Sequence, residues 1–264
     1  MRWGAMFWAI VLIVIGSMLF LDNLGVISVN VWAFVPAVML IVLGVWFIFG
    51  SLFRREVASE AASIPLGGSL RAAIRLRHGA GRLTLGSGAA SGELVRGTFV
   101  GGLSHRETRQ GDLMEADLSV PADVFGHSPW MWGPGRPLDW TLELTREVPL
   151  TLDLEMGANE ARLNLEDLRV TELRVKAGAS STTISLPAAA GLVRGKVEAG
   201  AASLALRVPA GVAGRFRVTG LTGTTVDSAR FARSGDEYRS ADFDSAANKV
   251  DFEITMGAGS VDIR

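Results

Sequence analysis

The chain has 264 residues, and its 26 lysines and arginines nearly balance its 27 aspartates and glutamates, which leaves a formal net charge of −1. This balance excludes both an acidic tail and the broad basic field with which proteins bind nucleic acids. The absence of cysteine excludes a disulfide framework and a thiolate metal site.

Two long apolar runs dominate the N-terminal region, at residues 3–21 and 31–53. Each run reaches the roughly 20 residues that a helix needs to cross the hydrocarbon core of a bilayer. The residues between the runs include turn formers such as Asn23 and Gly25. We therefore expect residues 1–55 to form a transmembrane helical hairpin.

A cleaved signal peptide is the alternative interpretation of the first apolar run. Residues 17–21 at its end are too bulky for the small-residue cleavage site of such a peptide, and a second apolar run follows directly. We therefore favour a membrane span over a signal peptide.

The charges that flank the two runs predict their orientation. Arg2 precedes the first run and Arg54 and Arg55 follow the second, whereas the connecting residues contain no lysine or arginine. Because positive charges remain on the cytoplasmic side, both ends of the hairpin are expected there. The sequence thus predicts a multi-pass protein of the cytoplasmic membrane whose C-terminal domain lies in the cytoplasm.

The C-terminal region, residues 69–264, contains a repeat, and it follows a small, polar segment at residues 56–68 that we interpret as a linker. A Gly-Ala pair recurs, and its three central copies are spaced by 21 and 22 residues. Five copies of the pair begin at Gly79, Gly157, Gly178, Gly200 and Gly257.

Apolar and polar side chains alternate on both sides of each Gly-Ala pair. Before Gly157, for example, Leu152 and Leu154 alternate with Asp153 and Glu155. A period of two is typical of a strand with one buried and one solvated face, whereas a helix has a period of 3.6. Because glycine tolerates a positive φ, we expect each glycine to form a tight corner between two strands.

One unit of strand, corner and strand cannot bury its apolar face alone, but stacked units can share one core. We therefore predict an all-β domain at residues 69–264. Its fold class is a β-solenoid or a closely related stack of hairpins, anchored to the membrane by the two transmembrane helices.

Residues with catalytic chemistry are sparse. The three histidines, His78, His105 and His127, lack metal-ligand spacing, and the inward position of His78 predicts a packed, hydrogen-bonded side chain. The glycine-rich stretch at residues 79–88 matches no phosphate-binding pattern, and no nucleophile elbow is present. We therefore expect no enzyme activity, catalytic residue, cofactor or metal.

One loop departs from the alternating pattern. Residues 128–137 contain the prolines and glycines of a loop, together with Trp130, Met131 and Trp132. Because exposed tryptophan is typical of interaction surfaces, these three side chains are candidates for contact with a partner protein or with the bilayer surface. The alternative is that the loop folds back and covers an open end of the solenoid.

Several segments carry a resemblance to a known family. Residues 16–25 and 32–44 resemble the hairpin that opens LiaF-type bacterial membrane proteins. Residues 148–158, 173–179 and 248–261 look like the toast-rack β domain of the same proteins. Some of these relatives have four membrane spans, whereas this sequence predicts two.

The resemblance implies a non-enzymatic accessory of the bacterial cell envelope, because LiaF-type proteins act with a membrane histidine kinase that senses cell-wall antibiotics, and restrain it. We therefore expect a membrane-anchored regulator or scaffold in envelope-stress signalling that contacts such a kinase. The second hypothesis is a self-associating structural or adhesin-like scaffold, in which solenoid edges pair between copies of a homo-oligomer. An enzyme or ligand-binding module is the third. No nucleic acid and no small-molecule substrate is expected as a partner.

Overall fold

A computed structural model describes residues 59–122 and 138–264, together with Ile13, Gly16 and Leu40. The predicted membrane helices at residues 3–21 and 31–53 lie almost entirely outside the described residues. The chain divides into two compact units, Met1–Glu56 and Val57–Arg264. In the part of the chain that the structure describes, no helix is long and apolar enough to cross a membrane.

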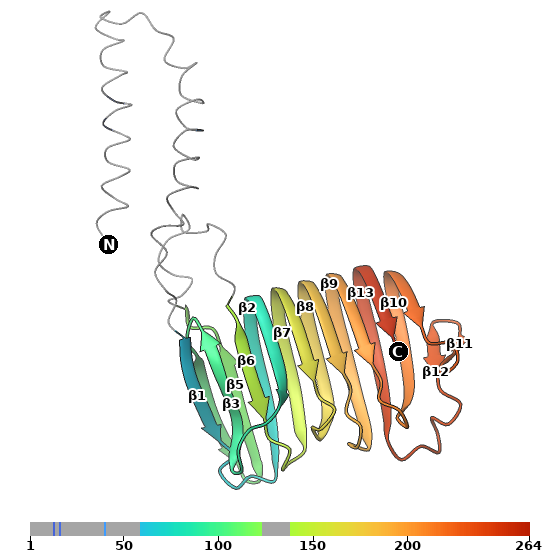
Figure 1. Cartoon of the computed structure of the whole chain (residues 1–264), viewed down its shortest axis with the longest axis horizontal. Helices are drawn as coiled ribbons and strands as arrows, with labels where there is room; N and C mark the ends of the chain where they lie inside the picture. Colours follow the sequence, from blue (N-terminus) through green and yellow to red (C-terminus); the bar gives the residue numbers. More distant parts are fainter. Residues whose placement is uncertain (1–12, 14–15, 17–39, 41–58, 123–137) are drawn as a thin grey trace, which may run out of the picture. The chain divides into compact units, whose positions relative to one another are not determined.

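The described part of the second unit is one sheet of thirteen strands (Figure 1). They are β1 (Ser59–Pro65), β2 (Arg71–Ser87), β3 (Glu93–Val100), β4 (Ser104–Gln110), β5 (Leu113–Ser119), β6 (Trp140–Leu144), β7 (Leu150–Asn164), β8 (Val170–Ser185), β9 (Leu192–Arg207), β10 (Ala213–Val226), β11 (Ala232–Ser234), β12 (Glu237–Arg239) and β13 (Lys249–Ile263).

Most of the long strands continue without interruption through a Gly-Ala pair, and the strand bends at this pair (Figure 1). In β7 the buried positions alternate up to Met156, the next two residues are exposed, and the alternation resumes at Ala161 and Leu163. The bend therefore turns the apolar side chains of both halves of the strand into the same core. A short turn, such as the one between Leu165 and Leu168, then leads to the next strand.

The long strands stack in parallel and in register. Each Gly-Ala corner lies beside the corner of its neighbour, as in the pairing of Ala158 in β7 with Ala179 in β8 and of Ala179 with Ala201 in β9. Each bent strand and its turn form one rung, so the predicted β-solenoid-like domain is confirmed. The order of the long strands is β2-β7-β8-β9-β13-β10, so the last strand of the chain lies between two earlier ones.

At the N-terminal end of the solenoid, two short strands share one rung. Strand β5 pairs in parallel with Arg71–Arg77, the first half of β2, and β6 pairs with Leu83–Ser87, its second half. Antiparallel strands complete this end, with β4 beside β5, β3 beside β6 and β1 beside β3.

The interpretation of residues 56–68 as a linker is wrong for much of that segment. Strand β1 pairs with β3 over its whole length, and Ile64 is buried in the core. Since four of the seven residues of this strand are small or acidic and exposed, its sequence shows little alternation. The backbone hydrogen bonds to β3 rather than an apolar face hold it in the sheet.

The conformational reason given for the repeated glycines is also wrong. None of these five glycines has a positive φ. Their backbones instead lie unusually close together: a Cβ added to Gly157 would lie 2.1 Å from the carbonyl oxygen of Gly79, and one added to Gly178 would lie 3.0 Å from that of Gly157. The five glycines are called the glycine row below, and an added Cβ at any of the last four would lie 2.1–3.1 Å from the carbonyl oxygen of the neighbouring rung.

Candidate functional site: the corner groove

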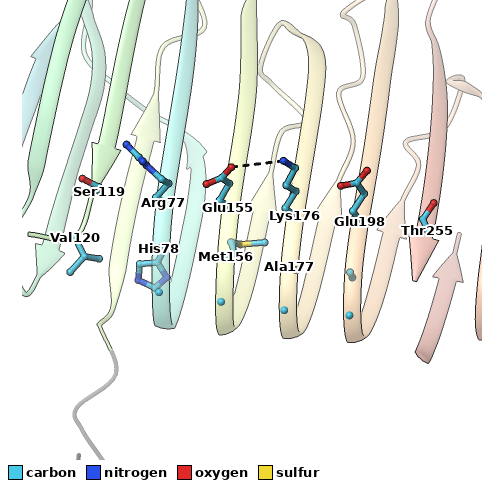
Figure 2. Close-up of a pocket in the computed structure, with 15 residues that line it drawn as sticks. Arg77, His78, Ser119, Val120, Glu155, Met156, Lys176, Ala177, Glu198 and Thr255 are labelled. Carbon is cyan, nitrogen blue, oxygen red and sulfur yellow. Dashed lines mark ion pairs between the residues drawn. The ribbon is translucent and has the colours of Figure 1, made fainter. Parts of the chain in front are cut away.

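An open groove of about 880 Å³ follows the corners of β2, β7, β8 and β9 (Figure 2). The first four glycines of the row form part of its lining, and because they have no side chains the groove is open there. Beside it lie the outward-facing side chains two positions before each corner glycine. They are Arg77, Glu155, Lys176, Glu198 and Thr255, with Ser119 at the β5 end.

The groove wall carries charges of alternating sign. The parallel register places Arg77, Glu155, Lys176 and Glu198 side by side on successive strands. Lys176 Nζ lies 4.0 Å from Glu155 Oε1. Because these side chains are exposed to solvent, such pairs contribute little to stability. Their main effect is to present an ordered pattern of charge to a partner.

Glu198 has a second cationic partner beside the groove. The Lys196 ammonium lies 2.6 Å from Glu198 Oε1. The hydrogen bond from this ammonium lowers the pKa of the Glu198 carboxyl and raises the pKa of Lys196. Both groups therefore stay charged around neutral pH, and the alternating pattern of the wall is maintained.

His78 is a buried residue of the groove lining on β2. Its side chain is 1% exposed, its Nε2 lies 2.8 Å from the carbonyl oxygen of Leu138, and its ring packs 5.2 Å from that of Trp140. The neutral tautomer that donates from Nε2 satisfies this carbonyl. Burial lowers the pKa of His78, although the Leu138 hydrogen bond and the Asp139 carboxylate act in the opposite direction. The predicted packed, hydrogen-bonded histidine is confirmed.

The rung formed by β5 and β6 lacks a Gly-Ala corner. Ser119 pairs with Arg77 on one half of β2, and Trp140 pairs with Leu83 on the other half. The backbone of Leu138 lies so close to Gly81 that an added Cβ would meet its nitrogen at 2.4 Å. Residues 121–137 therefore connect β5 to β6 at the point where the Gly-Ala pair connects the two halves of β2. We call these residues the insertion.

One flank of this insertion lies at the groove, and the other flank contacts His78. Val120, at its start, lines the groove, and Leu138, at its end, accepts the hydrogen bond of His78. The predicted contact residues Trp130, Met131 and Trp132 belong to the insertion and lie outside the described residues, as do the membrane-flanking charges Arg2, Arg54 and Arg55. Trp130, Met131 and Trp132 thus lie in the chain between β5 and β6, and their contacts are outside the described residues.

The groove wall presents charged side chains of both signs. Among the described residues, no group of three or more histidine, aspartate or glutamate side chains could hold a metal ion. The acidic and basic side chains of the wall face each other across neighbouring strands, as Lys176 and Glu155 do in Figure 2. Such a surface suits an extended or flat protein segment with its own alternating charges.

Sequence reasoning missed the groove and the nature of the insertion. A signal for the insertion was present, because the interval of 78 residues between Gly79 and Gly157 is much longer than the repeat of 21 or 22 residues. No comparable signal exists for the groove, because alternation indicates which side chains face outward but not how closely neighbouring backbones approach.

Two sequence families match the chain. The N-terminal domain of toast_rack (DUF2154) matches residues 53–207, and the LiaI-LiaF-like transmembrane region matches residues 6–48. The second match shows that the N-terminal part is a membrane region of the LiaI-LiaF type. Among curated proteins, the comparison finds no match to this chain.

A solved structure shares the fold of the second unit. It is the crystal structure of a candidate cell adhesion protein from Clostridium sporogenes, with a TM-score of 0.71 and 17% sequence identity over 78% of this chain and 98% of that protein. At this identity the likeness establishes the fold alone. Because the toast_rack match spans more than half of the sequence, the chain belongs to the toast-rack family, and with its LiaI-LiaF-like membrane region it is a LiaF-type membrane protein.

Proposed function

We propose that this protein is a non-enzymatic regulator of bacterial envelope-stress signalling that acts by contact with a membrane histidine kinase. One observation carries the proposal: a LiaI-LiaF-like transmembrane region and a toast-rack domain occur on one chain. This is the combination for which the family resemblance implies restraint of a kinase. Two transmembrane helices, at residues 3–21 and 31–53, would hold the protein beside its partner in the cytoplasmic membrane.

The mechanism rests on a rigid contact surface. A parallel stack of long strands with one continuous core changes shape little, so it can hold a partner in one arrangement. Contact shifts a two-state kinase only if it stabilises one state more than the other. The alternating charges of the corner groove support such selectivity, because a partner segment in the wrong register would bring like charges together.

The insertion at residues 121–137 supplies the apolar part of the proposed contact. Trp130 and Trp132 are the residue type that most often dominates binding energy at interfaces, and Met131 adds a flexible apolar side chain. Val120, which immediately precedes the insertion, lines the groove, and this supports a contact that uses both features.

Placement of the toast-rack domain in the cytoplasm belongs to the same proposal. It is supported by Arg2, Arg54 and Arg55, which flank the membrane region. The chain has no cysteine, so Thr108→Cys on the exposed strand β4 creates a unique label site. We expect a membrane-impermeant maleimide to label this cysteine only after the cells are opened, and labelling of intact cells would contradict the placement.

Crosslinking in native membranes tests the kinase contact. The full-length protein would be crosslinked and its captured partners identified by mass spectrometry, with the wild type compared with Trp130→Ala/Trp132→Ala. We expect a histidine kinase among the captured proteins and its marked reduction in the double variant. Leu70→Ala is a matched control, because Leu70 is an apolar residue outside the insertion with 71% of its side chain exposed. Absence of any histidine kinase would contradict the proposal.

A second candidate function is a self-associating scaffold at the membrane. The open edge of strand β10, described below, is the observation that favours it. Self-association and kinase contact use different surfaces in our proposals, so each can be tested separately.

A further inference from the structure

Strand β10 has an open edge at the C-terminal end of the solenoid (Figure 1). On one side it pairs with β13 over its whole length. On the other side β12 pairs only with Arg215–Arg217. Among the residues that the structure describes, no strand pairs with the other side of residues 219–226. This edge is about 25 Å long at the usual rise of a strand.

Backbone groups point out of this edge. The amide of Asp227, just after β10, donates to the carbonyl oxygen of Ile263 in β13 over 3.0 Å. Because successive residues of a strand direct their amide and carbonyl groups to alternate sides, those of Thr222, Thr224 and Val226 face away from β13. A row of free donors and acceptors is a template for another strand.

The side chains along the edge also lack cover. Leu221 is 83% exposed, which is the largest value among the exposed large apolar residues of the described part. Val226 faces the core but is only half-buried, whereas Ile263 and Leu206, which occupy the same position on β13 and β9, are fully buried. The core is therefore incompletely closed at this end of the solenoid.

The edges at the opposite end of the solenoid are protected against pairing. The outer strand β4 carries His105, Arg106, Glu107 and Arg109, and the outer strand β1 ends at Pro65. Charges and proline on an edge disfavour association with a further strand. By contrast, residues 219–226 of β10 contain no ionisable side chain and no proline.

We propose that the β10 edge pairs with the β10 edge of a second copy of this chain, antiparallel and around a twofold axis. In a twofold contact the same surface of each copy faces the other. Because this edge carries no charge, the two copies do not repel each other there. Pairing would also bury Leu221 and Val226 of each copy against the other copy. This homodimer does not depend on the kinase contact, because it uses the end of the solenoid and not the corner groove.

The first test is the mass of the full-length protein in lipid nanodiscs. Light scattering after size-exclusion chromatography should give two copies for the wild type and one copy for Leu221→Lys/Thr225→Lys, whose lysines repel across the axis. Thr141→Lys/Ser203→Lys is the matched control, because it adds two lysines to exposed strand positions away from the edge, on β6 and β9, and it should stay a dimer. A single wild-type copy, or an edge variant that stays dimeric, would overturn the proposal.

The second test locates the axis in native membranes. Since the chain has no cysteine, the variants Gly223→Cys, Thr224→Cys and Thr225→Cys each contain one thiol. Residues that face each other across an antiparallel pair have Cα atoms about 4.5–5.5 Å apart, within the range of a disulfide. Mild oxidation should link copies at one or more of these positions and not at Thr108→Cys. Failure at all three, or equal linking at Thr108→Cys, would contradict the proposed edge.

Discussion

Gly157 shows why even alanine is unfavourable at a corner of the solenoid. Its φ is ordinary for a strand, so conformational freedom does not explain it. The constraint is distance, because a Cβ would lie 2.1 Å from the carbonyl oxygen of Gly79, well inside van der Waals contact. The sequence therefore predicted the position of the corner correctly but not the physical reason for glycine there, since close approach depends on the neighbouring rung.

We expect Gly157→Ala to destabilise the domain by about 2 kcal/mol, because two rungs must separate to admit the methyl group. For a domain of this size the loss lowers the melting temperature by about 4–8 °C, which calorimetry or circular dichroism can measure. Gly86→Ala, on β2, is the control, since Gly86 has open space and an ordinary φ, and its melting temperature should not fall. Equal effects of the two substitutions would contradict the close-approach explanation.

His78 provides a pH-dependent contribution to stability. Burial lowers its pKa below the ordinary 6.5, while the Leu138 hydrogen bond and Asp139 oppose this shift. The unfolded chain thus takes up a proton at a higher pH than the folded chain, so stability should fall as the pH drops below about 6.5.

In the His78→Met variant this contribution is absent, because methionine, the residue of β7 at the same position, does not titrate. We expect denaturant unfolding to show a lower stability at pH 7.5, where the Leu138 carbonyl loses its donor, but a smaller loss between pH 7.5 and pH 5.5. The carboxylates titrate alike in both proteins and cancel in the comparison. An identical pH dependence of the two proteins would contradict the assignment to His78.

At the scale of the element, alternation was a reliable guide and composition was not. The apolar positions of β7, β8, β9 and β13 are buried as the period of two predicts. Strand β1 was missed, because Ile64 is its one buried apolar residue and the strand therefore shows no alternating pattern. The insertion between β5 and β6 was recognised as unusual, yet its place at a corner could not be known before the two strands were seen to share one rung.

The shared rung predicts that the insertion is dispensable for folding. We expect a chain in which a Gly-Ala pair replaces residues 121–137 to keep its fold, because Val120 and Leu138 would then join as His78 and Gly81 do in β2. Its melting temperature should lie within about 4 °C of the wild type, a change of roughly 1 kcal/mol. Loss of the cooperative unfolding transition would show instead that the insertion supports the core.

At the scale of the whole molecule, the main feature is that a membrane region and a toast-rack domain occur on one chain. The sequence predicted both parts, and the family matches establish the toast-rack domain and the LiaI-LiaF-like membrane region. The β10 edge lay beyond sequence reasoning, because the strand order β9-β13-β10, which leaves β10 outermost among the long strands, does not follow chain order. Restraint of a kinase is the claim that links the parts, and it concerns the assembled protein in a bilayer.

The most direct measurement is the autophosphorylation rate of the captured histidine kinase in nanodiscs, with and without this protein. Our account predicts a lower rate with the wild type and a return towards the free rate with Trp130→Ala/Trp132→Ala, whose apolar contact is removed. The Leu221→Lys/Thr225→Lys variant should restrain the kinase as the wild type does, because the β10 edge lies outside the proposed contact. An autophosphorylation rate that is the same with and without the wild-type protein would contradict the account.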